Sequence, residues 1–386
     1  MKRKICVVIT ARASYSRLKS IMNAIKSHSQ LELQVVTTCS ANYDEFGNVA
    51  KIIEEDGFHI DEKVYSYVGA YSLACSVQTT GLTLIELPQI FEKLKPDAVI
   101  TNGDRYETMA TAVAASYMNI ALVHMQGGDL TGNIDEKVRH AITKLADIHF
   151  ATSEASYKRL LLLGENPQKV FMHGCPSIDL IRDVCSMKKL DFNPLEKYKN
   201  FGNINAMPDE YYVVMQHPTT TNINKAREHY EQTLKAIKTL NRPTFIFYPN
   251  SDASAKQIQS AIDDFYHNNP NLPIHFFYNM KPEDFIKFLY FSKCLIGNSS
   301  VGIRECSYLA IPVINIGDRQ ENRERGLNVI DVPYDKDAIL DAIKKWESTG
   351  RPAQSFNYGN GYAGKKIADT LAVVDLGTQK KLTYNV

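Results

Sequence analysis

The feature that most limits the fold is a series of short apolar runs that recur along the chain with helical stretches between them. Most runs are apolar on both faces, as are the strands of a parallel sheet that helices cover on both sides. Helical periodicity is clearest at 16–25 and 136–145, which predict amphipathic helices. We expect strands at 5–10, 31–37, 98–101, 121–125, 149–151, 170–172, 212–216, 244–248, 274–277, 294–297 and 313–316.

The runs form two series, which predicts an α/β chain with two Rossmann-like, doubly wound domains. A polar stretch at 185–208, rich in Lys, Asn and Pro, separates the two series. We expect an N-terminal domain at 1–180 and a C-terminal domain at 181–364, followed by a last helix that begins at 365. Two domains of this type usually hold their ligand in the cleft that faces the C-terminal strand ends.

Length, charge and cysteine usage exclude several classes of protein. A chain of 386 residues is long enough for two or three domains. Its 44 Lys and Arg balance 43 Asp and Glu, so we expect no electrostatic attachment to nucleic acid or to an anionic membrane. The longest apolar runs, such as 5–9, are too short for a spanning helix or a signal peptide, which predicts a cytoplasmic protein. Seven scattered cysteines without a C-x-x-C pair predict buried, reduced thiols and no metal site.

A glycine-rich motif near the end of the chain resembles a dinucleotide fingerprint. GNGYAG at 359–364 matches G-x-G-x-x-G. Only about twenty residues follow it, too few to complete a βαβ unit. We therefore expect a turn that opens the last helix rather than a cofactor site.

Two turns between a strand and a helix have the composition of phosphate sites. The first, 10–16, carries Arg12 beside the free amides of a helix start. The second, GNSSVG at 297–302, offers backbone amides and two hydroxyls, and Glu305 follows within reach of ribose hydroxyls. The alternatives are a plain polar turn for the first and an ordinary serine N-cap for the second. One such turn in each domain favours a nucleoside diphosphate ligand.

Charged and polar residues also cluster where predicted strands end. Asp104 and Arg105 follow one strand, and the segment 124–129 ends the next. Strand-end carboxylates in adjacent crossovers converge, as acid–base chemistry requires. Asp135 and Arg139 are four residues apart on a predicted helix, so an i,i+4 ion pair is the alternative. His217, which ends a strand of the second series, is either a ligand contact or a structural histidine.

The wording of these motifs resembles one family. GDRYE, HMQGGDLTGNIDEKVRHAITKLAD, GCPSID, QHPTTT, PNSDA, IGNSSVGIRE and INIGDRQENRERG occur in this order between Arg12 and about Val332. They resemble the hydrolysing UDP-N-acetylglucosamine 2-epimerases, which include bacterial enzymes of sialic acid synthesis. The resemblance implies a glycosyltransferase-B-like pair of domains, with the segment 365–386 crossing back to the first domain. It also implies a homodimer or homotetramer, a UDP-sugar substrate, no metal and no other cofactor.

The resemblance assigns roles to individual residues. Asp104 and Asp135 match the catalytic carboxylates, and His217 and Gln126 belong to the same reacting centre. Three positions depart from the family: Ser14 and Gln126 stand where members often have acidic residues, and Asp129 replaces a longer glutamate. Gln126 cannot act as a carboxylate base, which leaves base and acid unassigned. The implied contacts to UDP or its sugar are Arg12, Ser16, Arg105, Arg139, Asn250, Phe277, Ser299, Ser300, Glu305 and Arg319, with Phe277 stacking near uracil.

The implied reaction converts UDP-N-acetylglucosamine to N-acetylmannosamine and UDP through a 2-acetamidoglucal. Three alternatives stay open. The same chemistry on UDP-N,N′-diacetylbacillosamine would serve legionaminic acid synthesis. A glycosyltransferase could use the same nucleotide pocket, and a non-catalytic UDP-sugar-binding protein would need no base.

Overall fold

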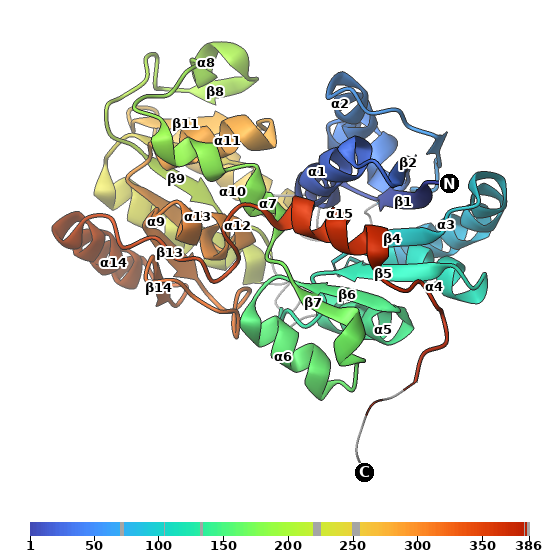
Figure 1. The fold of residues 1–386 in the computed structure, drawn as a ribbon. Coiled ribbons are helices and arrows are strands. Elements are labelled where there is room, and N and C mark those ends of the chain that lie inside the picture. Colours follow the sequence, from blue (N-terminus) through green and yellow to red (C-terminus); the bar gives the residue numbers. More distant parts are fainter. Residues whose placement is uncertain are drawn as a thin grey trace. The chain divides into compact units, whose positions relative to one another are not determined.

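The computed structural model describes residues 1–69, 73–103, 105–131, 134–218, 225–248, 255–381 and 383. Internal contacts divide the chain into two compact units (Figure 1). Unit 1 comprises residues 1–130, 134–180 and 358–386, and unit 2 comprises 131–133 and 181–357. The domain boundaries expected from the sequence, 1–180 joined by 365–386 and 181–364, stay a prediction.

Unit 1 is built on a parallel sheet with the strand order β3-β2-β1-β4-β5-β6-β7. Its strands are β1 (Arg3–Ile9), β2 (Leu31–Thr37), β3 (Glu62–Lys63), β4 (Ala98–Asn102), β5 (Ala121–Met125), β6 (Ile148–Ala151) and β7 (Val170–Met172). Its helices are α1 (Arg12–Ser27), α2 (Val49–Glu55), α3 (Leu73–Leu94), α4 (Thr108–Tyr117), α5 (Ile134–Leu145), α6 (Glu154–Leu162), α7 (Pro176–Asp179) and α15 (Ala363–Val373).

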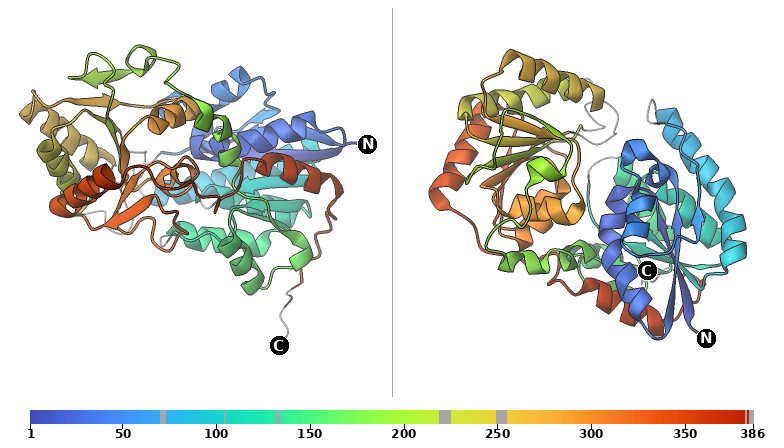
Figure 2. Two further views of the ribbon diagram at one scale, coloured as in Figure 1. Left: turned by 60° about the vertical axis from the view of Figure 1, so that its left-hand side comes forward. Right: turned by 90° about the horizontal axis from the view of Figure 1, so that it is seen from above.

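Alternate residues of β1 face two different helix layers. Ile5, Val7 and Ile9 are buried with α1, α2 and α15, whereas Cys6 and Val8 are buried with α3, α4 and α5. Figure 2 shows helices on both faces of the sheet within each unit. This arrangement explains why the sequence of β1 is apolar without alternation.

Unit 2 repeats the plan, with the strand order β14-β13-β12-β9-β10-β11-β8. Its strands are β8 (Asn200–Gly202), β9 (Tyr212–Met215), β10 (Thr244–Phe247), β11 (Ile274–Phe277), β12 (Cys294–Gly297), β13 (Val313–Ile316) and β14 (Val329–Val332). Its helices are α8 (Pro194–Lys197), α9 (Ala226–Leu240), α10 (Ala255–Asn268), α11 (Pro282–Tyr290), α12 (Ser300–Ile303), α13 (Glu305–Tyr308) and α14 (Lys336–Thr349). Only β8 runs antiparallel among these described strands.

The fold class predicted from the sequence is confirmed, and the expected strands are present with ends that differ by at most two residues. The sequence did not predict β3, β8 and β14. These strands are short and lie at the edges of the two sheets, where one side lacks a partner and the apolar signal is weak.

One face of the unit 2 sheet is packed by aromatic rings, and this corrects the role expected of Phe277. Its side chain is fully buried, and its ring stacks on those of Phe245 and Phe247 with centroids 5.6 Å away in both cases. Phe288 of α11 packs edge-on against Phe277. Phe277 therefore belongs to the hydrophobic core and presents no exposed face on which a uracil ring could stack.

The glycine-rich motif at 359–364 is a structural turn, as expected. Asp179 accepts hydrogen bonds from the N–H groups of Ala363 (2.8 Å) and Gly364 (2.6 Å), and from the Ser20 hydroxyl (2.5 Å). The protein's own carboxylate thus occupies the position at the start of α15 where a phosphate would bind. The same carboxylate connects α15 to α1 by hydrogen bonds, and the two helices lie side by side (Figure 1).

The expectation that all cysteines are buried is wrong for two of them, because Cys185 is exposed and Cys75 is partly exposed. Neither belongs to a core strand. In the described part of the chain, no three His, Cys, Asp or Glu side chains come together as metal ligands would. No described helix is both long enough and apolar enough to span a membrane.

Candidate active site

Each sheet has one point where the strand order reverses. In unit 1, β1 and β4 are neighbours and later strands are added outward from them; in unit 2, β9 and β12 have this position. Ligands of open α/β sheets bind outside the carboxyl ends of the strands at such a switch point. Both predicted phosphate turns lie there, because 10–16 follows β1 and 297–302 includes the end of β12.

The backbone of the turn after β1 is held by hydrogen bonds to the Ser14 side chain. The Ser14 hydroxyl accepts from the N–H of Ala11 (3.0 Å) and donates to the Ala11 carbonyl (2.7 Å). Helix α1 consequently begins at Arg12, earlier than the periodicity predicted, and its first turn contains no acidic residue. Arg12 is half-buried, and burial lowers the pKa of its guanidinium below the ordinary value. With serine at position 14, this helix start stays electropositive.

The ends of β4 and β5 meet at Gly103. Its N–H donates to the Met125 carbonyl (3.0 Å), and its φ of +84° suits glycine. Gln126 is buried, and its Oε1 accepts from Nη1 of Arg17 at 2.9 Å. A Cβ placed on Gly103 would lie within 4 Å of both of these side chains. Asp104 comes next in the sequence and lies outside the described residues.

Arg17 was not predicted as a site residue. It is five residues after Arg12, in the second turn of α1, and its side chain contacts the Gln126 amide. A basic residue in the helix that follows the first strand was the available signal.

His124 supports the Gly103 turn from behind. Its pKa falls to about 3 because the ring is fully buried, so the ring is neutral. Nε2 then donates to the Gly103 carbonyl (3.0 Å), and Nδ1 accepts from the Thr143 hydroxyl (3.2 Å). His124 thus holds the backbone immediately before Asp104.

The loop after β5 is held by internal hydrogen bonds. Asp129 accepts from the hydroxyls of Thr152 (2.8 Å) and Ser156 (2.6 Å), and its carbonyl accepts from Arg139 (2.7 Å). Arg139 is only 1% exposed. The structure places Asp129 and Arg139 in the support of this loop, whereas Asp135 is partly exposed in the first turn of α5.

In unit 2, the end of β12 lies so close to β9 that only glycine fits. Gly297 has φ +143°, and a Cβ there would lie 2.1 Å from the Met215 carbonyl oxygen. The close approach brings Asn298 beside the end of β9. Its Oδ1 accepts from the His217 N–H (2.7 Å), and its Nδ2 donates to the His217 carbonyl (2.9 Å).

Asn298 also organises the loop after β13, and it was not among the predicted site residues. Its carbonyl accepts from Nη1 of Arg319 (3.1 Å) and from Nε2 of Gln320 (2.9 Å). One asparagine therefore fixes the positions of His217, Arg319 and the start of α12.

The Ser299–Ser300 turn leads to a buried carboxylate. Nη2 of Arg304 donates to the Ser300 hydroxyl oxygen (3.0 Å). Glu305 is 8% exposed, and its buried Oε2 has no hydrogen-bond partner among the described residues. A buried acceptor without a partner costs about 1–3 kcal/mol, which a ligand hydroxyl would recover.

The remaining predicted residues are placed as follows. Ser16 is half-buried and donates to the Ala13 carbonyl (3.1 Å). Arg105 forms an ion pair with the buried Glu107 (2.7 Å). Asn250 lies outside the described part of the chain.

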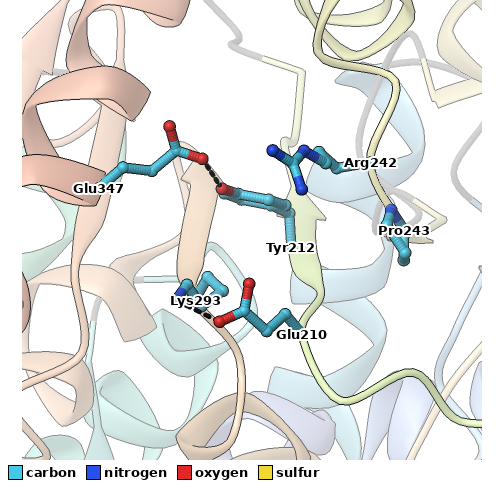
Figure 3. Close-up of a pocket in the computed structure, with 6 residues that line it drawn as sticks. All are labelled: Glu210, Tyr212, Arg242, Pro243, Lys293 and Glu347. Atoms are coloured by element: carbon cyan, nitrogen blue, oxygen red, sulfur yellow. Dashed lines mark hydrogen bonds and ion pairs between the residues drawn. The ribbon is translucent and has the colours of Figure 1, made fainter.

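A surface pocket of unit 2 lies at the amino-terminal ends of the strands, opposite the carboxyl ends that carry the predicted turn (Figure 3). Tyr212 donates to Glu347 (2.6 Å) and Lys293 pairs with Glu210 (2.8 Å). Glu210, Tyr212 and Lys293 lie at the amino ends of β9 and β12, and Glu347 belongs to α14. The switch-point argument therefore excludes the pocket as the main site.

Two Rossmann-like sheets, each with polar residues at its switch point, define the glycosyltransferase-B-like class of fold, and solved structures agree. The UDP-N-acetylglucosamine 2-epimerase of Neisseria meningitidis bound to UDP-GlcNAc has a TM-score of 0.76 at 18% identity, covering 95% of this chain and 99% of that one. The sequence family of UDP-N-acetylglucosamine 2-epimerases matches residues 23–372. The chain belongs to this family.

Two curated relatives are similar over most of their length. The GDP/UDP-N,N′-diacetylbacillosamine 2-epimerase (hydrolyzing) of Campylobacter jejuni is 33% identical over 86% of this chain and 84% of its own. The UDP-N,N′-diacetylbacillosamine 2-epimerase (hydrolyzing) of Legionella pneumophila is 30% identical over 98% of both chains.

Proposed function

We propose that this protein is a hydrolysing 2-epimerase that converts UDP-N-acetylglucosamine to N-acetylmannosamine and UDP. The observation that carries the proposal is the unit 2 switch point, where an Asn298-centred turn leads to the unpartnered carboxylate oxygen of Glu305. Membership of the family and the Neisseria complex with UDP-GlcNAc support the same class of ligand.

In this proposal, unit 2 binds the nucleotide. The hydroxyls and backbone amides of Ser299 and Ser300 donate to the diphosphate, and Glu305 accepts from the ribose hydroxyls. His217 and Arg319, both held by Asn298, complete the contacts.

The reacting carbons are assigned to residues of unit 1. The bond between C1 and the phosphate oxygen breaks, UDP keeps the electron pair, and a carboxylate removes the proton from C2. Water then adds its oxygen to C1 of the 2-acetamidoglucal, and a proton returns to the opposite face of C2. Asp104 and Asp135 are the proposed carboxylates, and Arg12 stabilises the departing charge.

Gln126 is consistent with this assignment because it is neutral. Its amide oxygen is occupied by Arg17, so the position contributes a hydrogen-bonding group and no base. The base is therefore assigned to Asp104 or Asp135.

A second candidate substrate is UDP-N,N′-diacetylbacillosamine, which the Campylobacter and Legionella relatives favour. Proton NMR of the protein with each UDP-sugar distinguishes the two, because it reports the sugar consumed, free sugar released and the configuration of the product. A non-catalytic UDP-sugar-binding protein would bind UDP and release no sugar.

Turnover in deuterated water is expected to place deuterium at C2 of the released sugar. The proton on C2 leaves and a solvent proton returns in the proposed sequence. NMR or mass spectrometry of the product measures the label. Product without deuterium at C2 would contradict the glucal route and indicate direct hydrolysis of the bond between the sugar and the phosphate.

Ser300→Ala and Glu305→Ala are each expected to weaken UDP binding. Loss of one hydrogen bond to a charged partner costs roughly 1.5–3 kcal/mol, or about one to two decades in affinity. Isothermal titration calorimetry with UDP checks both variants. Unchanged affinity in both would place the nucleotide elsewhere.

The homodimer or homotetramer, the cytoplasmic location and the ligand position between the two domains stay predictions. Sedimentation of the purified protein tests the first of them.

A further inference from the structure

The segment that follows α15 places a lysine at the far end of the helix that carries Asp135. Lys380 donates to the carbonyls of Thr143 (2.8 Å) and Ala146 (2.5 Å), at the end of α5 and just beyond it. A cation there satisfies carbonyls that the helix leaves open and opposes the negative end of its dipole.

A buried carboxylate holds Lys380 in this position. Glu165, with a side chain only 1% exposed, contacts Lys380 (2.5 Å), Lys144 (2.8 Å) and His149 (3.0 Å). Burial alone would raise the pKa of Glu165, but these three partners lower it to about 2, so the carboxylate is ionised. Nearby, Thr383 donates to the carbonyls of Gly164 and Glu165.

Thr143 connects this anchor to the candidate active site. Its carbonyl accepts from Lys380, and its hydroxyl donates to Nδ1 of His124 (3.2 Å). His124 in turn donates to the carbonyl of Gly103, the residue before Asp104. Gly127 packs closely against the His124 and Thr143 side chains, since a Cβ there would lie 3.1 Å from His124 and 3.3 Å from Thr143.

We propose that Lys380 is a positioning residue for the reaction: through Thr143 and His124 it sets the backbone turn at Gly103, the residue before Asp104 in the sequence. The inference rests on the proposed function for its kinetic consequence. Its structural part, the coupling of the 375–381 segment to the Gly103 turn, is independent of the substrate.

The test compares Lys380→Met with Lys381→Met, a matched change at the exposed neighbouring lysine. Lys380→Met is expected to lower kcat by about ten- to a hundredfold, since small displacements of a reacting group are costly. KM and the affinity for UDP, which unit 2 is proposed to bind, are expected to stay near the wild-type values. Lys381→Met should behave as wild type, and Lys380→Arg, which keeps the cation, should recover most of kcat.

Thr143→Val provides a second variant, which keeps the backbone carbonyl that Lys380 contacts and replaces the hydroxyl with a methyl group of similar size. If Lys380 acts through Thr143, the losses in kcat of the two single variants do not add in the double variant. Additive losses would contradict the proposed connection.

Hydrogen–deuterium exchange separates failure of this inference from failure of the proposed function. Peptides that contain Gly103 should exchange faster in Lys380→Met than in Lys381→Met, whether or not any sugar is turned over. If the wild-type protein releases no sugar but the two variants differ in exchange in this way, only the proposed function is overturned. Unchanged exchange at Gly103 in Lys380→Met overturns the role of Lys380. The role is also overturned if Lys380→Met lowers kcat, UDP affinity and melting temperature together and Lys380→Arg restores none of them.

Discussion

Asp104→Asn is expected to reduce kcat by about a hundredfold or more, the lower range of what a positioned acid or base contributes. Asparagine keeps the shape of the side chain and removes its basicity. Gly103, the residue before Asp104 in the sequence, is held by His124, and Gln126, which lies beside Gly103, is neutral and cannot replace a lost carboxylate. The affinity for UDP is expected to change little, because the nucleotide contacts are assigned to unit 2.

Gln126→Glu is the matched comparison, and we expect it to retain measurable activity. A new carboxylate would lie beside Arg17, which already donates to this side chain and would offset the added charge. Steady-state kinetics and calorimetry with UDP measure both variants. Should Asp104→Asn keep more than about a tenth of the wild-type kcat, a loss below about 1.4 kcal/mol, then Asp104 is not the essential carboxylate.

Gly297→Ala is expected to abolish UDP binding and to lower the free energy of unfolding by about 3 kcal/mol or more, as a backbone clash in a fixed turn does. A Cβ at this position would lie 2.1 Å from the Met215 carbonyl oxygen, and φ is +143°. Relief of the clash requires β12 to move from β9, which breaks both hydrogen bonds between Asn298 and His217.

Gly81→Ala is the control for this substitution. Gly81 lies in α3, has no atom within 4 Å of an added Cβ and has no positive φ. Alanine there is expected to stabilise the protein by about 0.4–1 kcal/mol. Denaturant unfolding and calorimetry with UDP measure both variants. A Gly297→Ala protein that binds UDP as the wild type does would refute the proposed nucleotide site.

Local pattern was sufficient for the fold class and for placing the predicted phosphate turns at the carboxyl ends of strands. The apolar runs of β1 and β5 reveal strands buried on both faces, because helices cover both sides of each sheet. Polar turns after such strands mark the carboxyl edge, so the turns at 10–16 and 297–302 could be predicted without knowledge of any contact.

Tertiary structure decided which of these residues hold the surrounding backbone in place and which have atoms left to contact a ligand. Asn298 reaches a residue 81 positions away, Asp179 caps a helix 184 positions later, and Lys380 contacts a carbonyl 237 positions earlier. Phe277 looked suited to stack on a base but lies inside an aromatic core. The sequence alone determines where most strands, helices and polar turns form, because propensity and periodicity act over neighbouring residues. Long-range hydrogen bonds and burial depend on how strands are ordered in the sheet, and only the folded chain decides that order.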